Sequence, residues 1–205
     1  LLRGLDPKRH LIHSEGILDV LDHSSPTTGY GAKLAIDLTD IDLKRVPASL
    51  PAPRTARPVG GVELFNTELT RETGLLILYA EWEWHETIDV ERYLAENNIE
   101  GIKYVALFDR GAAGHMRASD LLWLAAANTD PKRDIRLFGD VVIIDARSKR
   151  PGYGNNPKRF PNVVTSSTDT IHYVDERWAE YGIGELVESP SRRYRKLWLS
   201  EGAEW

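Results

Sequence analysis

A tetrapeptide that occurs twice constrains the fold of this chain more than any other feature. Asp-Pro-Lys-Arg stands at 6–9 and again at 130–133, an offset of 130 − 6 = 124 residues. Downstream of each copy an apolar run reaches an aspartate, Asp37 and then Asp145, at an offset of 145 − 37 = 108. Landmarks repeated in the same order predict two related structural units. The second unit is shorter by 124 − 108 = 16 residues, which corresponds to a polar loop at 22–31.

The second half of the chain alternates apolar runs of strand length with helical patterns. We expect strands at 74–83, at 102–108 and up to Asp145, with helices at 89–98 and from Ser119, an expected N-cap. A continuous apolar strand followed by a crossover helix is typical of parallel sheets. The sequence therefore predicts an α/β fold, with a mostly parallel sheet covered by helices and two related α/β units.

This interpretation divides the chain into four segments. We expect residues 1–45 to be the end of a first unit, 46–73 a proline-rich linker, 74–188 the second unit and 189–205 a tail.

The second unit is expected to close with a helix at 170–181, because its apolar residues recur at helical spacing and Gly182 follows as a stop. In the tail, four basic residues precede Trp198. Arginine and tryptophan are enriched in protein interfaces, so the tail is either a subunit contact or a partly solvated extension.

The two Asp-Pro pairs, at 6–7 and 130–131, allow two interpretations. The basic residues that follow them would suit a phosphate, but neither pair lies in a glycine-rich cradle. A helix exit, where proline ends the helix, explains both. His10 and His13 have the spacing of a ligand pair, yet no carboxylate stands at a defined spacing from them, so we expect no metal there.

Composition excludes some functions. With 26 basic and 31 acidic residues the net charge is −5, which argues against a nucleic-acid partner. No apolar run is long enough for a membrane span. The absence of cysteine fits a reducing compartment, so we expect a cytoplasmic protein. The sole methionine is Met116, which leads us to expect that the numbering begins inside a longer protein.

Three segments near the start resemble the C-terminal signature of the UbiD family of carboxy-lyases. These are Leu5 to Arg9, Gly16 to Pro26 and Gly29 to Thr39, in the family's order and spacing. Residues 101–183 are similar to the same domain again. A duplicated C-terminal region looks like the longer family members that are described as menaquinone-biosynthesis decarboxylases, related to 3-polyprenyl-4-hydroxybenzoate decarboxylases.

The resemblance implies an activity for a parent enzyme. The family decarboxylates aromatic or unsaturated acids non-oxidatively, using prenylated FMN with a divalent metal, Mn or Mg, and potassium. Its flavin domain and its Glu-Arg-Glu catalytic residues match nothing in this chain, so the cofactor is expected to bind elsewhere and this part to be inactive alone. By resemblance the partners are a second copy in a homo-oligomer, the flavin domain and a small aromatic acid. The alternative is a non-catalytic assembly module.

One loop, 22–33, carries groups that could face the substrate. In relatives that act on hydroxylated aromatic acids this loop approaches the substrate, which makes His23, Ser24 and Lys33 the candidate residues. Histidine can donate or accept a hydrogen bond, serine carries a hydroxyl and lysine a positive charge. The competing interpretation is that Asp-His-Ser-Ser-Pro is good turn chemistry and that His23 bonds only within the loop.

A second polar stretch lies at the predicted end of the strand at 74–83. Glu81, Glu83 and His85 alternate with Trp82 and Trp84, and Glu86 follows. An acid/base site at the sheet's carboxyl edge is one interpretation, and packed tryptophans with solvated acids the other. Lys149, Arg150, Lys158 and Arg159 flank the stretch at 152–156, where we expect a basic mobile loop without decisive chemistry.

Overall fold

The structure is a computed structural model that describes residues 4–42, 44, 55–65, 70–71, 74–80, 89–112, 117–153 and 159–198. Its chain divides into two compact units, Leu1–Phe160 and Pro161–Trp205, which we describe separately. The proline-rich stretch at 45–54 and residues 81–88, with the Glu81 to Glu86 edge, lie outside the described residues. Within the described part, none of the helices is both long and apolar enough to span a bilayer.

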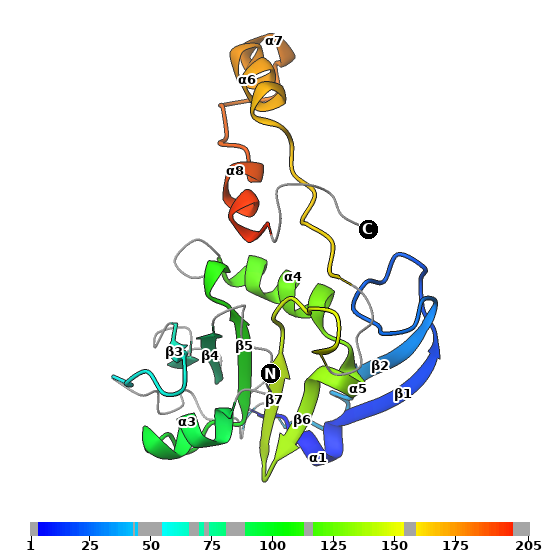
Figure 1. The fold of residues 1–205 in the computed structure, drawn as a ribbon, viewed down its shortest axis with the longest axis vertical. Helices are drawn as coiled ribbons and strands as arrows, with labels where there is room; N and C mark the ends of the chain where they lie inside the picture. Colours follow the sequence, from blue (N-terminus) through cyan, green and yellow to red (C-terminus); the bar gives the residue numbers. More distant parts are fainter. Residues whose placement is uncertain are drawn as a thin grey trace. The chain divides into compact units, whose positions relative to one another are not determined.

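A five-stranded mixed sheet forms the centre of the first unit (Figure 1). Its strands, in spatial order, are β3 (Val62–Leu64), β4 (Leu75–Ala80), β5 (Tyr104–Asp109), β7 (Val141–Asp145) and β6 (Ile135–Phe138). The three central strands are parallel, whereas each edge strand pairs antiparallel with its neighbour. The broad α/β expectation is confirmed. The sheet is mixed rather than mostly parallel, because short antiparallel strands, missed in the sequence, close both edges.

Alternate residues of the central strands enter two different cores. On one face, helix α3 (Val90–Glu96) contributes Val90, Tyr93 and Leu94 to a cluster with β4, β5 and β7. On the other face, Leu5 packs with Tyr104 and Val142. Because side chains point alternately to the two faces of a strand, strands buried on both sides read as continuous apolar runs.

Helix α4 (Ala118–Asn128) follows β5 through a short 3-10 turn, η3 (Arg110–Ala112). The expected N-cap, Ser119, is wrong: the N-cap is Arg117, directly before the helix, and its backbone N–H donates to the Asp120 carboxylate at 2.8 Å. Asp120 does lie in the first turn, where a negative charge is favourable. Leu121, Leu124 and Asn128 form the buried face of the helix.

The two Asp-Pro-Lys-Arg copies fold alike. Each forms a single helical turn, α1 (Pro7–His10) or α5 (Pro131–Asp134), that leads directly into a strand. Asp6 and Asp130 are the N-caps, and proline occupies the first helical position in both. The expected helix exit holds for the second copy, which directly follows the end of α4 at Asn128, but the proline at the first helical position also starts a new turn, which was not expected. The likeness is local, and the wider duplication remains a prediction.

A separate two-stranded sheet follows α1. Strands β1 (Leu11–Ile17) and β2 (Tyr30–Ile36) pair antiparallel, with Gly16 opposite Gly31 and Ser14 opposite Lys33. Figure 1 shows this hairpin beside α5. Lys132 of α5 reaches Glu15 of β1 at 2.5 Å, and the backbone N–H of Ala32 donates to Asp130 at 3.5 Å. These contacts join the two Asp-Pro-Lys-Arg regions within one unit.

The second unit contains α6 (Thr168–Glu176), α7 (Trp178–Tyr181), α8 (Ser191–Tyr194) and the 3-10 turn η5 (Arg195–Leu197). The single helix expected at 170–181 is divided at Arg177, and its stop is confirmed, since Gly182 has a positive φ of 62°. In the tail, Arg195 lies over the Trp198 ring at 5.0 Å, and the Trp198 indole donates to the carbonyl of Val163 at 2.9 Å. The described tail is thus tied to its own unit.

Candidate functional site

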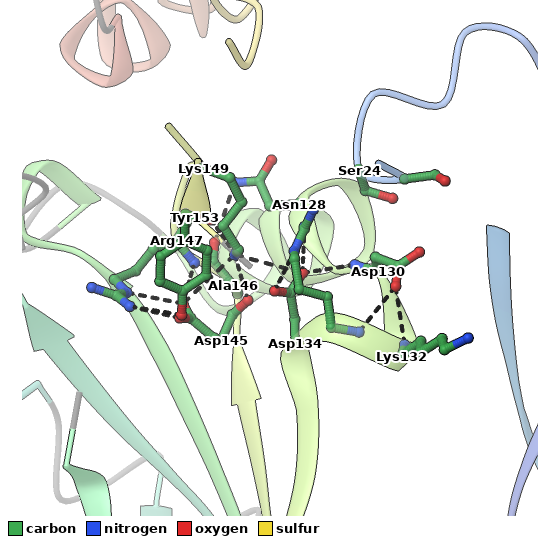
Figure 2. Close-up of polar contacts among 12 residues, drawn as sticks. Ser24, Asn128, Asp130, Lys132, Asp134, Asp145, Ala146, Arg147, Lys149 and Tyr153 are labelled. Carbon is green, nitrogen blue, oxygen red and sulfur yellow. Dashed lines mark hydrogen bonds and ion pairs between the residues drawn. The ribbon is translucent and has the colours of Figure 1, made fainter. Parts of the chain in front are cut away.

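Two parallel strands end in aspartates at the carboxyl edge of the sheet. Asp109 is the last residue of β5 and Asp145 the last of β7, and the two strands are direct neighbours. Open α/β folds bind ligands at this edge. Figure 2 shows the polar side chains that gather there, around Asp145, Arg147, Lys149 and Tyr153. We call this group, with Asp109, Arg133 and Asp134, the edge cluster.

Asp145 is the centre of the edge cluster. Its carboxylate accepts two hydrogen bonds from the Arg147 guanidinium, at 2.9 and 2.6 Å, and one from the Tyr153 hydroxyl at 2.6 Å. Burial alone would raise the pKa of Asp145, but the charges of Lys149 and Arg147 hold that pKa well below its usual range. The carboxylate therefore remains ionised throughout the physiological range.

Lys149 is buried, contrary to the expectation of a mobile basic loop. Its ammonium donates to the backbone carbonyls of Asp145 and Arg147, at 2.7 and 2.5 Å. It also lies 3.7 Å from the Asp134 carboxylate and 3.6 Å from that of Asp145. Burial lowers the pKa of Lys149, although Asp145 and Asp134 oppose this. A buried lysine so surrounded neutralises carboxylates and ties down the chain after β7.

Asp134 adds a second buried ion pair. Arg133 donates to both carboxylate oxygens of Asp134, at 2.7 and 2.6 Å, and the carboxylate also accepts the backbone N–H of Asp130 at 2.8 Å. Three carboxylates thus face three cations in the edge cluster, Asp109, Asp134 and Asp145 with Arg133, Arg147 and Lys149. The charges balance, which is the arrangement that a buried polar network needs.

Asp109 is the member of the edge cluster whose carboxylate has an oxygen without a hydrogen-bond partner among the described residues. Its Oδ2 accepts the backbone N–H of Ser148 at 2.8 Å, whereas its Oδ1 is buried and has no hydrogen-bond partner in the described part of the chain. Burial raises the pKa of Asp109 to about 6, against the opposing effects of Ser148, Lys149 and Arg147. This carboxyl can therefore take up a proton near neutral pH.

The predicted substrate-side loop is held largely by its own hydrogen bonds. Asp22 accepts from the backbone N–H and the hydroxyl of Ser24, at 2.8 and 2.6 Å. The Ser25 hydroxyl bonds to the carbonyls of Thr27 and Tyr30, at 3.0 and 2.7 Å. Both serines are buried. Ser24 and Ser25 therefore shape the loop, as its turn chemistry indicated.

The side chain of His23 contacts residues far from the loop in the sequence. Its Nε2 lies 3.3 Å from the Asn128 side-chain oxygen, and its ring meets the edge of Phe160 at 4.9 Å between centroids. Asn128 in turn donates to the backbone carbonyl of Ala146, at 3.2 Å, directly after Asp145. Through Asn128 of α4, His23 is therefore connected to the backbone next to Asp145 of the edge cluster, and no pattern in the sequence indicated this connection.

Lys33 lies on β2, where it is exposed. Its side chain extends along β1 toward Gly16. Within residues 4–42 the structure records no contact of Lys33 with His23 or Ser24. The structure thus does not gather the three predicted site residues at one point.

His10 is a structural residue. Its Nδ1 accepts the backbone N–H of Asp6 at 2.8 Å, and its Nε2 lies 2.8 Å from Asp40. Both ring nitrogens are thus used, which leaves neither for a metal, while His13 lies exposed on β1. Among the described residues no three histidine, aspartate or glutamate side chains form a group that could hold a metal ion.

The residues that the sequence did not reveal are Asn128, Phe160 and the edge cluster. A signal for part of the cluster was present, because Asp109 and Asp145 each follow a continuous apolar strand and the ends of parallel strands meet at one edge. The contact between His23 and Asn128 joins residues that are 128 − 23 = 105 positions apart, and no local pattern marks it.

Comparisons with known proteins give little beyond this geometry. No family model matches the chain. An uncharacterized protein of Helicobacter pylori (strain J99 / ATCC 700824) is 25% identical, over 82% of this chain and 27% of that protein. The chain thus spans about a quarter of the length of this curated relative. Since that protein has no stated activity, the function of this chain has to be argued from its own residues.

Proposed function

We propose that this chain is the C-terminal, assembly-forming part of a UbiD-like carboxy-lyase. The parent enzyme decarboxylates an aromatic acid of hydroxybenzoate or naphthoate type non-oxidatively, in quinone biosynthesis. The single observation that carries the proposal is the ordered signature at residues 5–39. A further support is that the loop of this signature presents His23 in a defined orientation against α4.

The decarboxylation requires few catalytic groups from this part of the protein. Loss of CO2 from an aromatic acid leaves a carbanion-like centre that needs an electron sink and a proton donor. Prenylated FMN supplies the sink when it is bound. This chain contributes a histidine that can hold a hydroxyl group of the substrate, and a loop whose shape is maintained by Asp22 and Ser25.

The described residues do not fit the flavin or its metal. The Asp-Pro turns, α1 and α5, are single turns without a glycine-rich cradle, and the described carboxylates are not grouped as metal ligands. The proposal therefore places prenylated FMN, Mn or Mg, and potassium on a part of the protein outside this chain.

Exposed apolar side chains support the assembly role. Ile17, Val20 and Leu21, at the tip of the β1–β2 hairpin, are 81%, 72% and 82% exposed. An apolar tip that the described chain leaves uncovered is typical of a protein interface. On this proposal it packs against a second copy of the protein or against the flavin domain.

A non-catalytic assembly module is the second candidate function. The observation that favours it is the internal satisfaction of the loop, where Asp22, Ser24 and Ser25 bond to one another and to the backbone. In that case His23 is a packing residue against Phe160 and Asn128.

The test uses the full-length protein reconstituted with prenylated FMN, Mn or Mg, and potassium. Release of CO2 is measured for a panel of hydroxybenzoates and naphthoates. Turnover of at least one acid is expected, and His23→Ala should reduce it about tenfold or more, the effect of losing one hydrogen bond to the reacting molecule.

The matched control is His13→Ala, which removes an exposed histidine from β1. Turnover that requires the flavin and falls only in His23→Ala supports the decarboxylase. Turnover that is equal in both variants leaves the assembly module as the role of this chain, and no turnover of any acid contradicts the decarboxylase.

A further inference from the structure

The orientation of the Asn128 amide is determined by its two neighbours. Its nitrogen donates to the backbone carbonyl of Ala146 at 3.2 Å, and a carbonyl oxygen can only accept. The amide nitrogen therefore has to face Ala146. The amide oxygen then faces the ring of His23, 3.3 Å from Nε2.

This amide orientation determines the tautomer of His23. An amide oxygen accepts hydrogen bonds, so Nε2 of His23 has to carry the proton and donate it. In the neutral ring Nδ1 then carries a lone pair, and it has no partner among the residues that the structure describes. The T-shaped contact with Phe160, at an interplanar angle of 84°, packs against the ring and opposes its rotation.

His10 provides an internal comparison. Its Nδ1 accepts a backbone N–H, so its Nε2 also carries the proton, which it donates to Asp40. Both of its nitrogens are occupied by the fold. His23 has the same tautomer with one nitrogen to spare, which is the arrangement of a histidine oriented for a ligand.

We propose that Asn128 is a positioning residue that holds His23 in the Nε2–H tautomer, so that Nδ1 accepts a hydrogen bond from a hydroxyl group of the aromatic substrate. The proposal rests on the proposed function and narrows its substrate class. A neutral phenol has an O–H to donate to Nδ1, whereas a phenolate or an unsubstituted ring has none. The preferred substrate is therefore an aromatic acid with a protonated hydroxyl group.

The tautomer is measured by nitrogen-15 NMR of histidine-labelled full-length protein, with the His23 signals assigned by their loss in His23→Ala. The wild-type protein should show a protonated Nε2 and an unprotonated Nδ1. A protonated Nδ1, or a mixture of tautomers, overturns the proposal whether or not any variant folds.

Two substitutions separate positioning from structural support. Asn128→Ala removes the acceptor, and the tautomers of His23 should mix. Asn128→Asp retains an acceptor for Nε2, and the Nε2–H tautomer should persist. A purely structural Asn128 predicts the same tautomer in both variants. The control is Asn97→Ala, which removes an amide that donates to the backbone carbonyls of Arg57 and Tyr93, and should leave His23 unchanged.

The substrate class is tested by adding 4-hydroxybenzoate or benzoate to the labelled holoprotein. The hydroxylated acid should shift the Nδ1 signal of His23, and benzoate should not. In turnover, Asn128→Ala should lower kcat/KM for the hydroxylated acid by about tenfold, which is the effect of losing one hydrogen bond. Asn128→Asp should lower kcat/KM less. No shift with the hydroxylated acid overturns the proposal. A shift without CO2 release instead means that the proposed decarboxylase activity fails while the positioning of His23 stands.

Discussion

His10 and Asp134 hold the same position in two turns of the same form. Each accepts the backbone N–H of the N-cap aspartate four residues earlier, Asp6 or Asp130, at 2.8 Å. The partners beyond the turn differ, because His10 faces the carboxylate of Asp40 whereas Asp134 faces the guanidinium of Arg133. One backbone geometry thus serves two electrostatic environments of opposite sign.

The first prediction exchanges one form of the turn for the other. His10→Asp retains an acceptor for the N–H of Asp6 but places a carboxylate against Asp40, which also loses its donor. We expect the free energy of unfolding at pH 7 to fall by roughly 1–3 kcal/mol, the cost of unsatisfied buried polar groups. Urea unfolding measures it, with His10→Asn as the uncharged control. Equal losses in the two variants would show that charge at this position has no effect.

The second prediction concerns the glycine pair of the β1–β2 hairpin. A Cβ on Gly31 would lie 2.5 Å from the Ser25 hydroxyl and 2.7 Å from a methyl of Leu18. Gly31→Ala should therefore destabilise the protein by roughly 1–3 kcal/mol through overpacking. Gly16 lies directly opposite, and its Cβ would meet nothing closer than 3.7 Å. Gly16→Ala is the control, and an equal thermal shift in the two variants would contradict the argument.

The third prediction tests the charge balance of the edge cluster. Lys149→Met removes the cation between Asp134 and Asp145 while retaining most of the side-chain volume. Breaking a buried ion network by deleting one partner costs roughly 3–5 kcal/mol, and we expect a loss of stability of that size. Lys132→Met removes an exposed lysine paired with Glu15 and should change little. Chemical denaturation compares the two, and a harmless Lys149→Met would show that the network is not needed for folding.

The sequence predicted what depends on local pattern. The central strands and α3 were expected close to their observed ends, because continuous apolar runs and helical spacing are local signals. The edge strands β3 and β6 were missed because each is three or four residues long, too short to show a period. The repeated tetrapeptide predicted two similar turns, but not that its proline begins each turn.

The candidate site also depends on contacts between distant residues, which local patterns in the sequence do not predict. His23 was selected by resemblance, and its partners Asn128 and Phe160 lie more than a hundred residues away along the chain. Lys149 was expected in a mobile basic loop. It is instead buried, because its ammonium pairs with the carboxylates of Asp134 on α5 and Asp145 on β7. Contacts of this kind arise from the packing of whole elements, which neither spacing nor composition encodes.

The last prediction concerns the pH dependence of stability. Burial raises the pKa of Asp109 to about 6, above the value of 3.8 for an ordinary aspartate. The folded protein therefore binds this proton more tightly than the unfolded chain, so the free energy of unfolding falls as pH rises from about 4 to about 6. A difference of about 2 between the two pKa values corresponds to about 3 kcal/mol.

Asp109→Asn removes this titration, whatever its constant effect on stability. Measured from pH 4 to pH 7, the difference in unfolding free energy should move in favour of the variant by up to about 3 kcal/mol. Asp37→Asn is the control that should stay flat. Hydrogen bonds from Thr39 lower the pKa of Asp37 below its ordinary value of 3.8, so its carboxylate is ionised in both the folded and the unfolded chain over most of this range, and the difference for that variant should change little from pH 4 to pH 7. A pH-independent difference for Asp109→Asn would mean that Asp109 is already ionised at pH 4. In that case the cations of the edge cluster stabilise the buried carboxylate at least as much as its desolvation destabilises it.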